Sequence, residues 1–161
     1  MSLPAGFDPI PVDDFEPLLL STKEHFDTYW SATKPLLAKC IDKAMHGEMT
    51  IDDLYNAALA GKVYIFIFKN DKTITKSVKL ALALEIISYP RLPAMNVVSL
   101  GGSALDPLYE KFWKMVCGWA YMNGVRVIEG RVSPAMERVI SRYGFKPVYT
   151  HMRLDLMEAM K

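Results

Sequence analysis

The sequence predicts a mixed α/β fold of the α+β kind, built around a central sheet that is mostly antiparallel. Apolar residues recur with helical spacing until about Gly61, and from Val63 the spacing changes to the two-residue alternation of strands. After the pair Gly101 and Gly102, the patterns typical of helix, strand, helix and strand follow one another. This order predicts helices first, then three neighbouring strands, then a helix–strand–helix–strand tail.

The first sixty residues predict an extended segment followed by helices. Residues 1–11 contain three prolines and a glycine, so we expect them to run extended. Residues 12–15 resemble a helix start, and helical spacing continues to about Gly47, with breaks expected near Ser31 and Pro35. A second helix is predicted to begin after Thr50, whose spacing to Asp53 is that of a capping box, and to end at Gly61.

Three runs of β-type residues predict an antiparallel meander. They cover residues 63–68, 78–86 and 94–100, joined by short connections. The middle run alternates cleanly, and one of its faces carries the small residues Ala81 and Ala83. A face with two alanines leaves room for close packing of a helix or a ligand.

The second half predicts two further helices and two further strands. Asp106 and Pro107 are typical of a helix start, and a strand is expected over residues 125–132. A turn at Ser133 then leads into a helix over residues 134–143 that stops at Gly144, and a final strand is expected over 147–156. Neither a repeat nor a linker interrupts the pattern, so we expect a single domain over residues 1–161.

Charge and composition exclude several classes of function. The formal net charge is +1, without the basic excess typical of nucleic-acid binding. The chain has no apolar run as long as a membrane span and no secretion signal, so we expect a soluble cytoplasmic protein. Three histidines and two cysteines show no metal-ligand spacing, so no metal is expected. Cys40 and Cys117 lie in apolar helical patterns, which is typical of buried thiols.

The order of elements over roughly residues 10–156 resembles the Gcn5-related N-acetyltransferase (GNAT) fold. The likeness is carried by Trp119-Ala120, by Asn123-Gly124-Val125 and by the ending Arg142-Tyr143-Gly144-Phe145. It implies a GNAT-like sheet with helices on both faces and transfer of an acyl group from acyl-CoA to an amine. The stretch over residues 127–145 is also similar to small tailed-phage proteins of GNAT-like fold, some of which are virion components.

The resemblance implies a binding loop for acetyl-CoA after the third strand of the meander. In the family, a Q/R-x-x-G-x-G/A loop holds the pyrophosphate on backbone N–H groups, since free amides and a helix dipole attract an anion. Here Ser99 stands where the family has Gln or Arg. The residues that fit the remaining spacing are Leu100, Gly101, Gly102, Ser103 and Ala104. The alternative is that the glycine pair simply makes a turn.

The resemblance also implies a carboxylate base and a tyrosine acid. Glu129 is the first candidate base, with Glu85 second; the alternative is that Glu129 pairs with Arg126 or Arg131. Tyr143 is the candidate donor to the leaving thiolate, or else a packing residue. Aligned through Gly144 and Phe145, the chain has Ile140 where the family has its tyrosine and Ser133 where it has asparagine.

Two functions therefore stay open, and a plain small-molecule binder that uses the same cleft is a third. One is an acyltransferase, of weak or lost activity, that acts on an unknown amine. The other is a catalytically silent GNAT-fold phage protein that serves in virion assembly with a protein partner. The protein could also form a homo-oligomer. Four aromatic residues would either form a partner surface or pack in the core: Phe26, Tyr29, Trp30 and Tyr55.

Overall fold

A computed structural model describes residues 15–44, 47–71, 77–102 and 106–161. The chain divides into two compact units, Met1–Gly130 and Arg131–Lys161. Each unit is described by itself, and the single domain over residues 1–161 stays a prediction.

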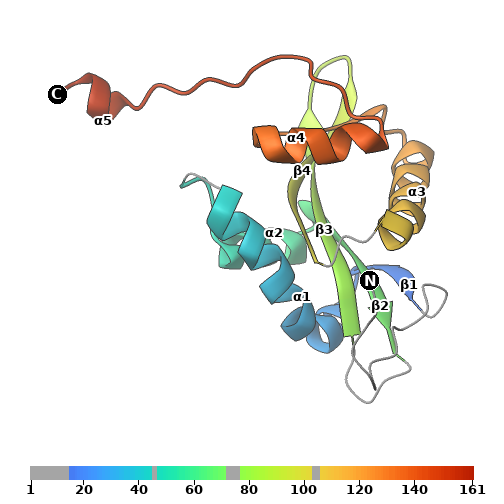
Figure 1. Cartoon of the computed structure of the whole chain (residues 1–161). Helices are drawn as coiled ribbons and strands as arrows, with labels where there is room; N and C mark the ends of the chain where they lie inside the picture. Colours follow the sequence, from blue (N-terminus) through green and yellow to red (C-terminus); the bar gives the residue numbers. More distant parts are fainter. Residues whose placement is uncertain (1–14, 45–46, 72–76, 103–105) are drawn as a thin grey trace, which may run out of the picture. The chain divides into compact units, whose positions relative to one another are not determined.

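The first unit contains a five-stranded sheet with the order β1-β2-β3-β4-β5 (Figure 1). The first four strands pair antiparallel, and β5 pairs parallel with β4. The mostly antiparallel sheet and the three-stranded meander are therefore confirmed. The strands are β1 Glu16–Leu19, β2 Val63–Asn70, β3 Ser77–Ser88, β4 Pro93–Gly102 and β5 Val127–Gly130.

Helices cover both faces of this sheet, as the sequence predicts. Helices α1 (Lys23–Ala44) and α2 (Ile51–Leu59) pack on one face, and α3 (Asp106–Met122) packs on the other (Figure 1). Strand β2 lies between the two helix layers, and its successive side chains point alternately towards α1 and α2 and towards α3. Ile65 and Ile67 belong to the cluster under α1 and α2. The intervening Phe66 contacts the ring of Trp119 on α3, with 4.9 Å between the ring centroids.

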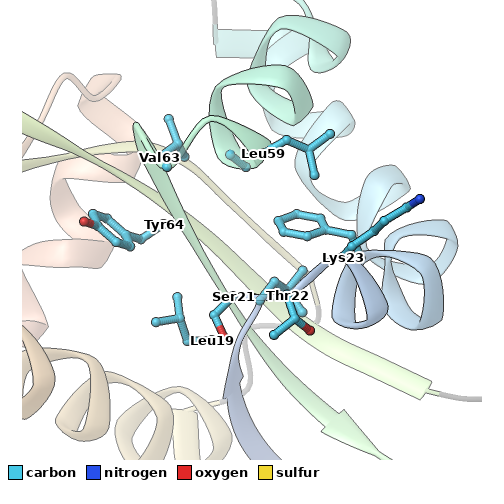
Figure 2. Close-up of a pocket in the computed structure, with 11 residues that line it drawn as sticks. Leu19, Ser21, Thr22, Lys23, Leu59, Val63 and Tyr64 are labelled. Carbon is cyan, nitrogen blue, oxygen red and sulfur yellow. The ribbon is translucent and has the colours of Figure 1, made fainter.

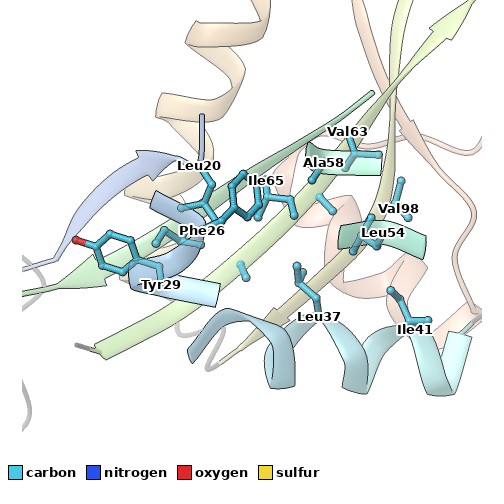
Figure 3. Packing of buried hydrophobic residues seen from close by; sticks show 13 residues of the cluster. Leu20, Phe26, Tyr29, Leu37, Ile41, Leu54, Ala58, Val63, Ile65 and Val98 are labelled. Carbon is cyan, nitrogen blue, oxygen red and sulfur yellow. The ribbon is translucent and has the colours of Figure 1, made fainter. Parts of the chain in front are cut away.

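The main hydrophobic cluster lies between the sheet and the pair α1 and α2 (Figure 3). Ala81 and Ala83 are fully buried in it, so the small face of β3 receives a helix. Phe26 and Tyr29 are also buried there, and the rings of Trp30 and Tyr55 pack against the cluster 4.8 Å apart. These four aromatic side chains are thus part of the core packing, not a free partner surface.

The predicted helix start near residue 12 is wrong where the structure describes it, because residues 16–19 form strand β1. Residues 12–14 lie outside the described residues. Strand β1 pairs with β2 from Glu16 opposite Lys69 to Leu19 opposite Phe66, and Phe15 is buried beside it. Pro17 has no N–H to donate, which an edge strand tolerates. Tertiary pairing overrides the local helix-start signal.

Helix α1 is continuous, so the breaks predicted at Ser31 and Pro35 are wrong. Pro35 lies inside the helix, where its missing N–H leaves the Ser31 carbonyl without its usual partner. Both residues are exposed, so water can reach that carbonyl. The helix is held instead by the residues that face the sheet: Leu37 is fully buried, and the Thr33 hydroxyl donates to the Tyr29 carbonyl over 2.8 Å.

Helix α2 confirms its predicted capping box. The Thr50 hydroxyl accepts from the Asp53 N–H over 3.2 Å, and the Asp53 carboxylate accepts from the Thr50 N–H over 2.9 Å. These backbone and side-chain hydrogen bonds lower the pKa of Asp53. Gly61 follows the helix with a φ of 74°, a conformation that favours glycine.

The second unit contains α4 (Pro134–Ile140), a 3₁₀ turn labelled η2 (Ser141–Tyr143) and α5 (Leu156–Ala159). The predicted turn and stop are confirmed, because Ser133 caps α4 and Gly144 has a φ of 93°. The predicted strand over residues 147–156 is wrong. Within the second unit, residues 147–155 pair with no strand, and alternation of side chains cannot by itself supply the hydrogen bonds that a strand needs. Asp155 caps α5 where the predicted strand would continue.

Candidate functional site

The pairing between β4 and β5 ends before β4 does. The parallel register runs from Ala94 opposite Val127 to Val97 opposite Gly130. Strand β4 continues along β3 to Gly102, and α3 begins at Asp106. Among the described residues of the first unit, β4 therefore lacks a strand neighbour on its β5 side beyond Val97. This end of the β4–β5 pairing, here called the divergence, leaves the β5 side of β4 without a strand neighbour in the described part of the first unit.

A bulge divides β4 into two stretches at the same point. Ser99 pairs with Ala83 and Val97 pairs with the next residue of β3, Leu84, so that Val98 has no partner across the ladder. An extra residue of this kind reverses which alternate side chains face a given side of the sheet. Asn96 before the bulge and Ser99 after it consequently lie on the same face as Ala83.

Before the bulge, a polar row crosses three strands. Glu85 of β3 pairs with Asn96 of β4, and Asn96 pairs with Glu129 of β5. Residues directly opposite each other across a ladder point to the same side of the sheet, so the three side chains form one row. All three are half-buried. The row places both candidate bases on the face of the sheet that α1 and α2 cover farther along.

Each carboxylate in the row accepts a hydrogen bond from a neutral donor. The Asn96 amide donates to Glu85 Oε1 over 2.8 Å, and the Tyr89 hydroxyl donates to Glu129 Oε1 over 2.6 Å. The alternative pairing of Glu129 with Arg126 is not formed, because the guanidinium of Arg126 lies 5.5 Å from the centroid of the Tyr121 ring of α3. The row thus presents two carboxylates, each fixed through one oxygen.

After the bulge, the residues of β4 contact the backbone of α1. A side chain at Gly101 would meet the carbonyl of Leu36, and the Ser99 hydroxyl donates to the Leu37 carbonyl over 3.1 Å. Gly102 has a φ of 121°, and a side chain there would meet the Lys79 carbonyl. Both glycines therefore have a packing role. Of the predicted pyrophosphate loop, Leu100, Gly101 and Gly102 end β4, whereas Ser103 and Ala104 lie outside the described residues.

Tyr143, the predicted acid, is the last residue of the 3₁₀ turn in the second unit and is half-buried. Glu129, the candidate base, belongs to the first unit. Ser133, at the position of the family's asparagine, accepts a hydrogen bond from the Met136 N–H over 3.3 Å as the cap of α4.

Asn96 and Tyr89 are site residues that sequence reasoning missed. Asn96 is a polar residue inside an otherwise apolar strand, which is a signal that the sequence offers. Tyr89 follows the end of β3, and its hydrogen bond connects residues 40 positions apart. That connection depends on the strand register, which the sequence does not specify.

Two small pockets in the first unit lie beside the polar row, since Val63, which lines one of them, pairs with Glu85. One, of about 300 Å³, is formed where β1, the start of α1 and the end of α2 meet; Leu19, Lys23 and Leu59 line it (Figure 2). The other, of about 250 Å³, is lined by residues that include Tyr64 and Trp119. Both are lined mainly by apolar groups and contain none of the three residues of the row.

The described residues offer neither a metal site nor a membrane span. No group of His, Cys, Asp or Glu side chains in that part of the chain has the geometry to hold a metal ion. None of the helices described is both long enough and apolar enough to cross a membrane.

Comparison with solved structures shows that the chain has the fold of GNAT acetyltransferases. An acetyltransferase of Trypanosoma brucei superposes with a TM-score of 0.64 at 14% identity, over 88% of this chain and 99% of that chain. An acetyltransferase of Clostridium acetobutylicum, solved with acetyl-CoA, gives 0.64 at 14% identity, over 89% and 97%. An aminoglycoside N-acetyltransferase in complex with CoA gives 0.60 at 15% identity, over 88% and 95%.

Neither a family model nor a curated protein matches the sequence. At identities this low, the structural likeness establishes the fold alone.

Proposed function

We propose that the protein is an acyltransferase that moves an acyl group, such as acetyl, from acyl-CoA to an amine. The observation that carries the proposal is the divergence of β4 from β5 after Val97 and Gly130, with the carboxylate row directly before it. A thioester entering at the divergence would lie near a carboxylate able to accept a proton. Similar folds solved with acetyl-CoA and CoA support this choice of donor.

In the proposed complex, the connection between β4 and α3 binds the pyrophosphate of acyl-CoA. The backbone N–H groups of residues 100–104 and the first turn of the 17-residue helix α3 would hold it, because unpaired amides and the helix dipole favour an anion. The close packing at Gly101 and Gly102 is compatible with this binding, because it uses the space where a side chain would lie and does not use the backbone N–H groups.

Glu129 is proposed as the base. It would accept a proton from the acceptor ammonium. The neutral nitrogen then forms a bond to the thioester carbonyl carbon as the C–S bond breaks, and its second proton passes to the leaving thiolate. Glu85, on the next strand but one, would attract the positive charge of the incoming ammonium. Tyr143, three residues after the position at which the resemblance places the family's tyrosine, is retained as the proposed donor to the leaving thiolate if the register of this helix differs.

A second proposal is a GNAT-fold protein without catalysis that serves in assembly, for which a phage virion is one setting. Three observations favour it: Ile140 stands in the tyrosine position, Ser133 is used as a helix cap, and Ser99 is used to bind α1. Among the side chains that the structure describes, ten of the sixteen exposed large apolar ones belong to residues 131–161, as a partner-binding segment would require.

Binding of the donor separates the two proposals. We expect acetyl-CoA at a hundredfold excess over its Kd to stabilise the folded protein by about 2.7 kcal/mol and to raise Tm by about 5–10 °C. Thermal denaturation with acetyl-CoA, with CoA and with AMP as the control ligand measures this. An unchanged Tm with millimolar acetyl-CoA would contradict the acyltransferase and favour the silent protein.

Removal of the base tests the chemistry after binding. We expect Glu129→Gln to lower kcat for acetyl transfer by about 10²-fold or more, because the amide cannot accept the proton. Glu85→Gln is the matched control, since it removes the same charge from the same row and should act mainly on the KM of the amine. Release of CoA in the presence of a panel of primary amines follows both. Equal rates for Glu129→Gln and the parent protein would exclude Glu129 as the base.

A further inference from the structure

The connection between β3 and β4 carries a side chain that contacts the proposed base. Tyr89 directly follows the last residue of β3, and its hydroxyl donates to Glu129 Oε1 over 2.6 Å. The bond reaches from the β3–β4 connection to β5, past the strand that lies between them. Its length lies at the short end of the range for a hydrogen bond between a hydroxyl and a carboxyl group.

The bond fixes one oxygen of Glu129 and leaves the other available. No other described side chain bonds the Glu129 carboxylate, and the nearby Arg126 is held over Tyr121 on the opposite face. A glutamate on a strand has three side-chain torsions, and ordering them costs conformational entropy. A hydroxyl that holds Oε1 in advance removes part of that cost from the reaction and directs Oε2 towards the substrate.

We infer that Tyr89 is the positioning residue of this site: its hydroxyl sets the orientation in which Glu129 accepts the proton of the amine. The inference rests on the proposed acyltransferase. The proton moves from the ammonium nitrogen to Glu129 Oε2, the neutral nitrogen forms the new C–N bond, and the C–S bond breaks as the second proton passes to the leaving CoA thiolate. Tyr89 neither gains nor loses a proton in this sequence.

Removal of the hydroxyl alone tests the inference. We expect Tyr89→Phe to lower kcat about tenfold, the change that corresponds to one hydrogen bond of about 1.4 kcal/mol, with the KM for acetyl-CoA unchanged. Acetyl-CoA with 1,4-diaminobutane, a lysine peptide and glucosamine provides the assay. Tyr121→Phe is the matched control, because it removes a hydroxyl from an exposed tyrosine on the opposite face, and we expect it to leave kcat unchanged.

A double-mutant cycle separates positioning from a purely structural role. If Tyr89 acts through Glu129, Tyr89→Phe should cost about tenfold in the parent protein and nothing further in Glu129→Gln. A hydroxyl that only stabilises the fold would slow both backgrounds equally. Equal losses, or a parent rate that Tyr89→Phe does not change, would overturn the inference while the acyltransferase stands. Failure of the parent protein to bind acetyl-CoA or to acylate any of the three amines would overturn both.

Discussion

The two stretches of β4 on either side of Val98 use polar and small residues for different purposes. After the bulge, Ser99 and Gly101 contact the backbone of α1. The Ser99 hydroxyl bonds a carbonyl of the helix, and the missing side chain of Gly101 lets the helix approach. Before it, Asn96 lies half-buried between two carboxylates, neither of which is paired with a cation among the described residues. One strand thus combines a stretch that packs against a helix with a stretch that lies between two carboxylates of the neighbouring strands.

This contrast changes how the glycine pair is interpreted. A glycine at the end of a strand beside a helix start is the pattern of a phosphate loop, but the same glycine is required wherever two backbones approach closely. At Gly101 the close approach is present in the fold itself. The pair is therefore explained without a ligand, and the case for a ligand depends on the divergence of β4 from β5 and on the row before the bulge.

The largest expected effect comes from filling the space at Gly101. The new methyl of Gly101→Ala would overlap the Leu36 carbonyl, which belongs to a helix backbone and cannot rotate away. We expect a loss of about 3 kcal/mol in the free energy of unfolding, measured by denaturant titration. Gly118→Ala is the matched control: no atom lies within 4 Å of its new methyl, and a helical alanine should stabilise by about 0.5–1 kcal/mol. Equal effects of the two changes would show that α1 does not pack on Gly101.

A smaller effect is expected at Ser99. The change Ser99→Ala removes the hydrogen bond to the Leu37 carbonyl without creating a clash, so we expect a loss of about 1 kcal/mol in the free energy of unfolding. Ser31→Ala, on the exposed side of α1, should change it by less than about 0.5 kcal/mol. A gain of stability in Ser99→Ala, with CoA binding lost, would instead assign Ser99 to the ligand.

Much of the fold was predictable because local patterns and tertiary structure agree over most of the chain. The alternation over residues 78–86 and the Thr50 capping box specify their elements locally, and both are confirmed. Strand β1 was missed because its hydrogen bonds come from β2, about fifty residues away. Pro35 suggested a break that the buried side of α1 overrides.

The candidate site was predictable only in part. Glu129 and Glu85 are predicted as bases because the resemblance implies a carboxylate in the cleft, with Glu129 on the strand that faces it and Glu85 on the small-residue face. Their alignment through Asn96 depends on the register of three strands and on the bulge at Val98, and neither follows from composition or spacing. Tyr89 reaches Glu129 only because the β3–β4 connection folds back towards β5, which a one-dimensional pattern does not encode.

The most direct test is to map where CoA contacts the protein by the backbone amide signals in two-dimensional NMR. We expect CoA to shift the amides of Leu100, Gly101 and Gly102 and of the first turn of α3, and acetyl-CoA to shift Glu129 in addition. The amides around Lys23 and Leu59 should not move. Shifts confined to that pocket, or no shifts at millimolar CoA, would contradict donor binding at the divergence of β4 and β5.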